Sequence, residues 1–94
     1  MNVPRLRLSP GVGRLISGFP PETKKLIRSG LAELRKAPER GNDLQEELSG
    51  FKSFKWGRYR VIYIVNDREK CIDIYYVGHR RDVYDQFRQL LRGQ

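Results

Sequence analysis

The 94-residue chain has a single cysteine, a single histidine and no long apolar run. Because Cys71 is alone, no intramolecular disulfide can form, and we expect it to pack as a small apolar side chain in a reducing, cytoplasmic compartment. One cysteine and one histidine do not supply the ligands of an ordinary zinc site. No segment approaches the roughly 20 apolar residues of a membrane span, and the N-terminus lacks the apolar region of a signal peptide. The sequence therefore predicts no metal ion, no other cofactor and no membrane segment.

Acidic residues are also few relative to basic ones. Nineteen Lys and Arg residues against eleven Asp and Glu give a formal net charge of +8 at pH 7. Residues 1–50 contribute +3 and residues 51–94 contribute +5, so the C-terminal half is the more basic. This balance favours a polyanionic partner, either nucleic acid or an acidic protein, and a basic surface kept for solubility is the alternative. The length fits one globular domain, which we expect to span residues 1–94.

The first half of the chain has the pattern of a strand followed by two helices. Residues 3–8 alternate apolar and basic side chains, as in a strand. Ser9 is a suitable N-cap and Pro10 a suitable first helical residue. Apolar residues at i, i+3, i+4 and i+7 then predict one helix over residues 10–19 and a second from Pro21 to Ala37. These two helices should form an antiparallel hairpin.

From Phe51 onward, aromatic and β-branched runs over residues 51–56, 59–66 and 71–77 predict three strands. Residues 38–50, in between, are polar and rich in turn-forming residues. Val83, Phe87, Leu90 and Leu91 share one helical face and predict a short C-terminal helix. The predicted fold class is α+β: an N-terminal strand, a helical hairpin packed on one face of a small, mainly antiparallel sheet, and a short C-terminal helix.

The strand over residues 59–66 also predicts which face of the sheet is free. A period of two places Tyr59, Val61 and Tyr63 on one face, and Arg60 with Ile62 on the other. If the helical hairpin covers the first face, Arg60 projects from an open face. We expect a partner to bind across that side.

Two segments place arginine and tyrosine next to strand ends. They are Gly57-Arg58-Tyr59-Arg60-Val61-Ile62-Tyr63 and Val77-Gly78-His79-Arg80-Arg81-Asp82-Val83-Tyr84. Together they can bring several cations, one imidazole and two phenols to one edge of a sheet, which is a set able to hold a phosphodiester and move protons around it. Cleavage of RNA by its adjacent 2′-hydroxyl needs such groups and no metal, because the nucleophile belongs to the substrate.

Individual side chains in these segments have suitable chemistry. Arg60 and Arg80, with Lys52 or Lys55, can stabilise charge on phosphorus. His79 is the one side chain of a type that titrates near neutral pH. The ring of Tyr84 can stack on a base, which contributes roughly 1–3 kcal/mol per base. The structural alternatives are a solvated strand-surface arginine, a capping histidine and a tyrosine that closes the core.

At these residues the chain resembles the RelE/ParE superfamily of bacterial and archaeal toxin–antitoxin toxins. The resemblance covers nearly the whole chain, including Ser9-Pro10, the helical hairpin, the Leu48-Ser49-Gly50 turn and the two arginine–tyrosine segments. RelE-type members cleave messenger RNA in the ribosomal A site without metal and are held inactive by a small antitoxin. The resemblance implies a cytoplasmic, ribosome-dependent endoribonuclease whose partners are the ribosome, mRNA and a cognate RelB-like antitoxin in a hetero-oligomer.

The resemblance also implies roles for single residues. Arg60 is similar to the family arginine after Gly-x-Tyr, which stabilises the transition state, and Arg80 to the arginine after Val-Gly-x, which acts near the leaving group. Tyr84 resembles the tyrosine that stacks on the RNA. The family's paired lysines correspond loosely to Lys52 and Lys55, and His79 stands where some relatives have lysine, so the general base is not assigned. Further RNA-binding candidates are Arg58, Arg81, Lys24, Lys25 and Arg28.

Two other functions fit the same resemblance. ParE-type members inhibit DNA gyrase and lack the RNA-cutting residues, and a degenerate toxin would bind its antitoxin and cut nothing. The presence of Arg60, His79, Arg80 and Tyr84 together favours the endoribonuclease.

Overall fold

Five strands form one mixed sheet, in the order β1-β5-β4-β3-β2, in a computed structural model that describes residues 3–93. The strands are Arg5–Leu8 (β1), Asn42–Asp43 (β2), Lys52–Trp56 (β3), Tyr59–Asn66 (β4) and Cys71–His79 (β5). β1 runs parallel to β5, and the other neighbours are antiparallel. The predicted α+β fold is confirmed, and β2 adds a strand within the segment 38–50, which was predicted to be polar and turn-rich. The predicted domain 1–94 extends outside the described residues at positions 1, 2 and 94.

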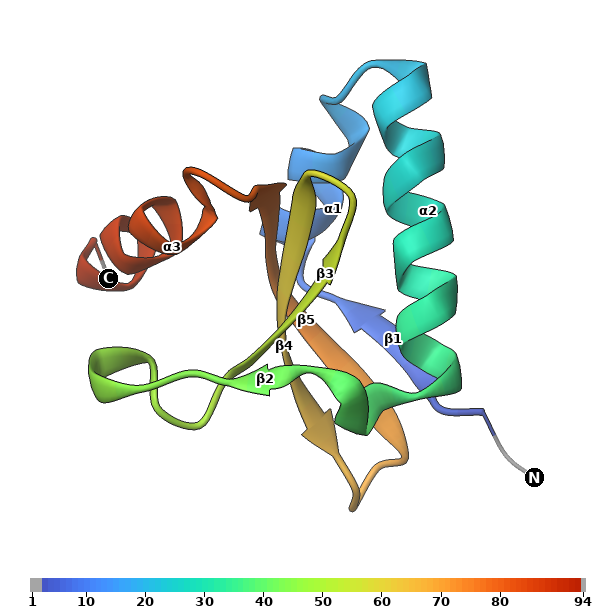
Figure 1. Cartoon of the computed structure of the whole chain (residues 1–94), viewed down its shortest axis with the longest axis vertical. Helices are drawn as coiled ribbons and strands as arrows, with labels where there is room; N and C mark the ends of the chain where they lie inside the picture. The colour runs from blue at the N-terminus through green and yellow to red at the C-terminus, as the bar shows by residue number, and fades with distance from the viewer. Residues whose placement is uncertain (1–2, 94) are drawn as a thin grey trace.

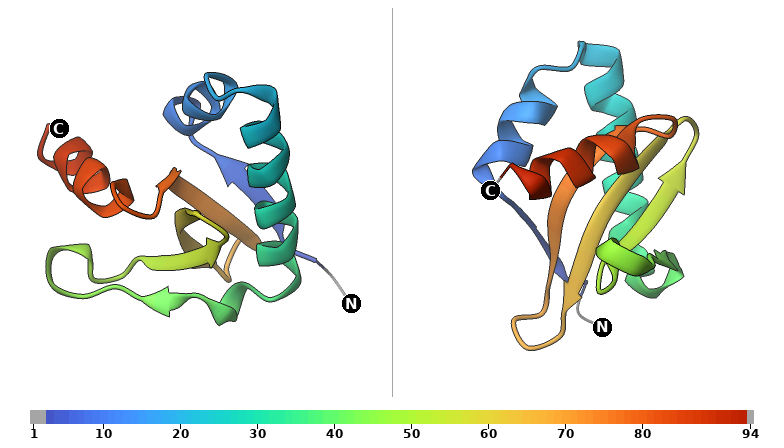
Figure 2. Two further views of the ribbon diagram at one scale, coloured as in Figure 1. Left: turned by 45° about the horizontal axis from the view of Figure 1, so that its top comes forward. Right: turned by 90° about the vertical axis from the view of Figure 1, so that its left-hand side faces the viewer.

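The helices lie on both faces of this sheet. They are Pro10–Ser17 (α1), Pro21–Lys36 (α2) and Val83–Arg92 (α3), with short 3₁₀ turns at Pro38–Arg40 (η1) and Glu46–Leu48 (η2). α1 and α2 form the predicted antiparallel hairpin on one face, and α3 lies on the other (Figures 1 and 2). Within residues 3–93, no helix has both the length and the apolar character needed to cross a membrane.

The start of α1 follows from local chemistry. The Ser9 Oγ accepts a hydrogen bond from the Val12 N–H at 3.2 Å, and Pro10 occupies the first helical turn. Both features match the sequence prediction, because a side-chain acceptor satisfies an N–H that has no partner inside the helix.

The larger core lies between the helical hairpin and the sheet. Leu31 and Leu34 of α2 pack in the same cluster as Val61 and Tyr63 of β4, which confirms the predicted face. Gly30 is the point of closest approach, because a Cβ there would come within 2.0–2.5 Å of the Trp56 indole ring. The Trp56 Nε1 donates to the Leu26 carbonyl at 2.8 Å, which fixes the end of β3 against α2. Burial raises the pKa of Tyr63 to about 12, and its hydroxyl donates to the Pro38 carbonyl at 2.6 Å.

The opposite face of the sheet is not open. Val83 and Phe87 of α3 join Leu48 and Ile62 in a second buried cluster. The expectation of an uncovered face was therefore wrong, because the apolar stripe of α3 and the segment around η2 bury its centre. Arg60 lies two residues from Ile62 on the same face and remains half-buried rather than buried.

A bulge in β5 changes which of its residues share a face. Tyr76 pairs with Ile62 and Ile74 pairs with Tyr63, so Tyr75 has no partner in the β4–β5 ladder. The extra residue shifts the alternation, and Ile74 and Val77, three positions apart, reach the same core. Continuing the register from this bulge places Gly78 opposite Arg60 and His79 opposite Tyr59.

Candidate active site

Lys55, Arg60 and Gly78 form one row across β3, β4 and β5. The register pairs Lys55 with Arg60 and Arg60 with Gly78. Directly paired residues project from the same face, and counting by two from Ile62 places this row on the face of α3. A Cβ added at Gly78 would meet Val83 at 3.4 Å, so the first turn of α3 lies over the end of the row.

Two turns meet at this end of the sheet. Gly57 and Arg58 join β3 to β4, and the φ of +55° at Gly57 is in the left-handed region that favours glycine. The Arg80 N–H donates to the Arg58 carbonyl at 2.7 Å, which ties this turn to the one between β5 and α3. The contact brings Arg58, Arg80 and Arg81 to the end of the sheet where Arg60 lies.

The cations gathered here have no acidic partners. Among residues 3–93, every ion pair within 4.0 Å uses basic residues other than Lys55, Arg58, Arg60, Arg80 and Arg81. Four of these five side chains are exposed, and Arg60 is half-buried. Unneutralised positive charge attracts an anion, and a guanidinium offers planar pairs of N–H donors that match a phosphate. We call these five residues the unpaired cation cluster.

Tyr84 lies beside this cluster because α3 begins there. Its hydroxyl is 3.0 Å from the Oγ of Ser53, which faces Ile62 across the β3–β4 ladder. Ser53 is two residues from Lys55 and on the same face. Sequence reasoning missed Ser53, because nothing in the sequence links this serine of a predicted strand to Tyr84, 31 residues away.

Lys52 lies on the other face of β3. It is three residues from Lys55, so the two predicted lysines point to opposite sides of the sheet. The Lys52 Nζ is 2.8 Å from the Oδ1 of Asp43, its direct neighbour on β2. The structure therefore brings Lys55 to Arg60 and holds Lys52 elsewhere.

His79 also projects from the face of the sheet that the helical hairpin covers. It is paired with Tyr59, and the two rings meet edge to face with centroids 6.0 Å apart. The His79 Nδ1 accepts a hydrogen bond from the Arg81 N–H at 3.2 Å, so in this arrangement a neutral ring carries its proton on Nε2. His79 thus supports the β5–α3 turn, and it does not share the face of Arg60.

The remaining predicted RNA-binding residues lie on α2. Lys24, Lys25 and Arg28 line one shallow hollow with Pro21 and Glu22. The Trp56–Leu26 contact places this part of α2 next to the end of β3, so the α2 cations border the same end of the molecule as the unpaired cation cluster. No group of three or more His, Cys, Asp and Glu side chains in the described part of the chain is placed to hold a metal ion.

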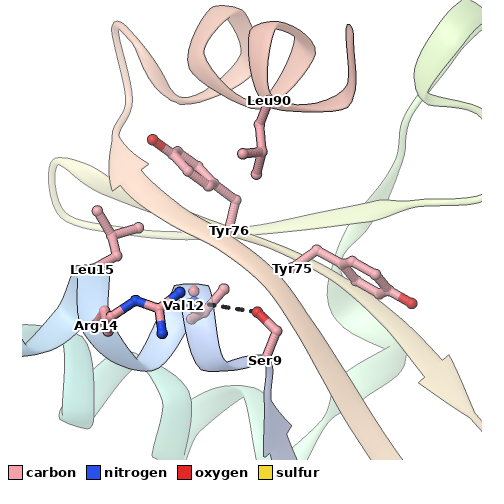
Figure 3. A pocket seen from close by; sticks show the side chains of 8 residues that line it. Ser9, Val12, Arg14, Leu15, Tyr75, Tyr76 and Leu90 are labelled. Carbon is pink, nitrogen blue, oxygen red and sulfur yellow. Dashed lines mark hydrogen bonds between the residues drawn. The ribbon is translucent and has the colours of Figure 1, made fainter. Parts of the chain in front are cut away.

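A separate groove runs between α1, β5 and α3 (Figure 3). Its volume is about 460 Å³, and its lining is largely apolar, with Arg14 as its cation. Leu90 of α3 is 45% exposed and Tyr75 of β5 is 38% exposed, so large apolar side chains reach solvent here. The residues lining the groove are Ser9, Gly11, Val12, Arg14, Leu15, Tyr75, Tyr76 and Leu90.

Sequence comparison links the chain to known toxins. Residues 19–84 match the family described as the ParE toxin of the type II toxin–antitoxin system parDE. Toxin RelG of Mycobacterium tuberculosis is 33% identical over 60 residues, which cover 63% of this chain and 69% of RelG.

Structural comparison gives the same result. The RelBE2 toxin–antitoxin complex from Mycobacterium tuberculosis matches with a TM-score of 0.77 and 27% identity, over 84% of this chain and all of the matched chain. A variant of the toxin RelE from E. coli, in the free state, matches with a TM-score of 0.73 over 94% of this chain and 93% of its own. At 13% identity, this second match shows a shared fold alone.

Proposed function

The chain belongs to the RelE/ParE superfamily of toxins from type II toxin–antitoxin systems, and on that premise we propose that it is a ribosome-dependent endoribonuclease that cleaves mRNA. The observation that carries this proposal is the Lys55–Arg60 row, with the arginines of two turns and the phenol of Tyr84 beside it. Because the ribosome and mRNA are in the cytoplasm, the toxin acts there.

In the proposed reaction the 2′-oxygen of the RNA attacks the adjacent phosphorus. The new bond joins the 2′-oxygen to phosphorus, and the bond from phosphorus to the 5′-oxygen breaks, leaving a 2′,3′-cyclic phosphate and a 5′-hydroxyl. One proton leaves the 2′-hydroxyl and one reaches the 5′-oxygen, so the step needs no oxidant, reductant or added nucleophile. The protein has to stabilise the extra charge on phosphorus and assist both proton transfers.

We assign the steps by position. Arg60 donates to the phosphate oxygens, because it stands in the middle of the row and has no carboxylate within 4.0 Å among residues 3–93. Arg80, in the turn after β5, donates to the leaving 5′-oxygen. Lys55, paired directly with Arg60 across the β3–β4 ladder, acts at the 2′-hydroxyl. Tyr84 presents its ring to a base. Lys52 and His79 face the helical hairpin, so we give them no step at the reacting atoms.

The other cations around this row are proposed to bind the RNA backbone and the ribosome. Arg58 and Arg81 flank the row at the two turns, and Lys24, Lys25 and Arg28 extend positive charge along α2. Contacts of this kind are mainly electrostatic, so they position the substrate and carry no sequence information.

The partner that inactivates the toxin is proposed to be a cognate, RelB-like antitoxin, since several solved relatives are RelB–RelE toxin–antitoxin complexes. We propose that an amphipathic, acidic antitoxin segment occupies the groove of Figure 3, because its apolar lining is exposed and the chain has a net charge of +8. Leu90→Glu should weaken binding about ten- to a hundredfold, the effect of removing one leucine side chain from an apolar interface. Isothermal titration with the protein encoded by the neighbouring short reading frame measures this. Leu26→Glu, on the exposed face of α2, is the matched control.

A second candidate function is inhibition of DNA gyrase, favoured by the description of the matching family as ParE toxin. Pulse labelling after induced expression separates the two. The endoribonuclease should stop protein synthesis first and leave A-site cuts in mRNA, whereas the gyrase inhibitor should stop DNA synthesis first and alter plasmid supercoiling. Purified protein on programmed ribosomes then tests cleavage directly, and intact mRNA after incubation with folded toxin would contradict the proposal.

A further inference from the structure

We infer that Ser53 is a positioning residue for the proposed cleavage, because its buried hydroxyl holds the hydroxyl of Tyr84 against β3, two residues before Lys55. This inference rests on the function proposed above. It adds a residue that lies in the core of the sheet, where no contact with RNA is possible.

The Ser53 side chain is buried and needs a hydrogen-bond partner. Ser53 is only 4% exposed, and within residues 3–93 it is the one buried residue of polar or charged type. A buried hydroxyl destabilises the fold unless it has a hydrogen-bond partner. The partner of Ser53 is the Tyr84 hydroxyl, 3.0 Å away, and no buried side-chain nitrogen or oxygen in the described part of the chain lacks a partner.

The contact joins two elements that are 31 residues apart in the sequence. Ser53 is the second residue of β3, and Tyr84 belongs to the first turn of α3. The rotation about the Cα–Cβ bond sets the direction of a tyrosine side chain, and holding the hydroxyl at its end restricts that rotation. Ser53 and Lys55 are two residues apart on the same face of β3, a distance of about 7 Å along the strand. The Tyr84 hydroxyl is therefore held next to the Lys55–Arg60 row.

The apolar contacts of α3 do not fix the ring in this way. Val83 and Phe87 pack against Ile62 and Leu48 and set the position of the helix. Tyr84 itself is only half-buried at the edge of that cluster. The hydroxyl pair adds a restraint on the direction of its side chain. Ser53 therefore acts through Tyr84 and not on the substrate.

The test uses the full chain in single-turnover cleavage on programmed ribosomes, with Ser53→Ala, Ser53→Thr, Tyr84→Phe and the Ser53→Ala/Tyr84→Phe double variant. Ser53→Ala should lower the maximal rate about three- to tenfold, the effect of losing one neutral hydrogen bond. The ribosome concentration for half-maximal rate should not change, because Ser53 contacts no ligand. Ser53→Thr keeps the hydroxyl and should restore the rate. Ser29→Ala, an exposed serine of α2, is the matched control.

The double variant separates positioning from general damage to the fold. If Ser53 acts only through the Tyr84 hydroxyl, Ser53→Ala should have no further effect in the Tyr84→Phe background. Equal losses in both backgrounds, or wild-type cleavage by Ser53→Ala, would overturn the inference. Thermal melts of each variant show whether it is folded at the assay temperature.

A second readout does not depend on cleavage. The ring resonances of Tyr84, followed by NMR in isotopically labelled free toxin, should shift and broaden in Ser53→Ala and return in Ser53→Thr. Unchanged Tyr84 resonances in Ser53→Ala would overturn the inference whether or not the toxin cuts mRNA. Absence of cleavage by the wild-type toxin, with the resonances responding to Ser53, would instead contradict the proposed function.

Discussion

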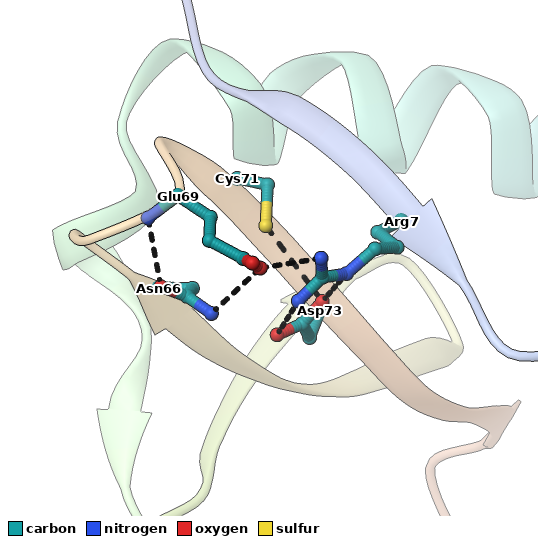
Figure 4. Close-up of polar contacts among 5 residues, drawn as sticks. All are labelled: Arg7, Asn66, Glu69, Cys71 and Asp73. Atoms are coloured by element: carbon teal, nitrogen blue, oxygen red, sulfur yellow. Dashed lines mark hydrogen bonds and ion pairs between the residues drawn. The ribbon is translucent and has the colours of Figure 1, made fainter.

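The two ends of the central sheet use arginine in opposite ways. At the end near the β4–β5 turn, Arg7 of β1 forms ion pairs with Asp73 and Glu69 (Figure 4). A second Arg7–Asp73 contact measures 3.1 Å, and Asn66 holds Glu69 in turn. At the other end, Arg60 and the rest of the unpaired cation cluster have no carboxylate within 4.0 Å among residues 3–93.

Paired and unpaired arginines have different consequences at the two ends of the sheet. The Arg7 guanidinium holds the pKa of the Asp73 carboxyl below its usual range, so both charges persist and join β1 to β5. Cys71 lies beside them, buried, and burial raises the pKa of its thiol, which keeps it a protonated packing residue as predicted. The other end keeps like charges together without compensation, an arrangement that opposes folding and favours an anionic ligand. Position and pairing, more than residue type, separate the structural arginine from those proposed to act on RNA.

The largest expected effect is loss of cleavage at the unpaired end. Arg80→Ala should lower the single-turnover rate on programmed ribosomes by about 100–1,000-fold, because it removes one donor that stabilises developing charge. Arg80→Lys should recover only part of this, since an ammonium lacks the planar fork. The backbone N–H that binds Arg58 remains in both variants, so the melting temperature should hold.

Arg68→Ala is the matched control, an exposed arginine in the β4–β5 turn at the opposite end. It should cleave at the wild-type rate. If Arg80→Ala retains near-wild-type cleavage, or if both variants lose activity equally, the two ends are not functionally distinct and the assigned site is wrong.

An intermediate effect is expected from the cations on α2. Removing the three charges should weaken ribosome binding about tenfold near 0.1 M salt. The slope of log binding constant against log salt concentration should become shallower by roughly 0.7 for each RNA phosphate that the variant no longer neutralises. The cleavage rate at saturating ribosomes should not change. Binding measured over a salt series tests the Lys24→Ala/Lys25→Ala/Arg28→Ala variant against a control that removes the same charge elsewhere, Arg5→Ala/Arg40→Ala/Arg68→Ala. Equal slopes for the two variants would show that binding depends on net charge alone.

The smallest effect concerns stability at the paired end. Because the folded pKa of Asp73 is lowered, its ion pair adds stability above the unfolded value of about 3.9, and this contribution is lost as pH falls through the folded pKa. Asp73→Asn should therefore lower the melting temperature by a few degrees near pH 6, with the difference from wild type shrinking below pH 4. Cleavage should be unaffected. A constant difference from pH 6 to pH 2 would mean that the charge of Asp73 does not matter.

Much of the candidate site followed from residue order, and the exceptions have a common cause. Arg60 and Lys55 could be placed on strands, and Arg80 after a strand, because turn residues and alternation mark those positions. Alternation also implies that Lys52 and Lys55, three apart, face opposite sides. The side of the sheet on which His79 lies, by contrast, depends on the bulge at Tyr75, and no turn-forming residue in the sequence predicts that bulge. Ser53 could not be singled out, since its partner lies 31 residues away on another element.

The sequence by itself determined the three helices and the four longer strands of this protein, because helix and strand periods, the Ser9 cap and the glycine at position 57 are local properties of the chain. It also determined the excess of basic residues and the presence of arginine beside tyrosine in two motifs. Only the tertiary structure decided which cations remain unpaired, that α3 covers the face expected to be open, and that Tyr84 rests on Ser53. These features depend on strand register and on contacts between distant segments, where a shift of one residue exchanges the two faces of a strand.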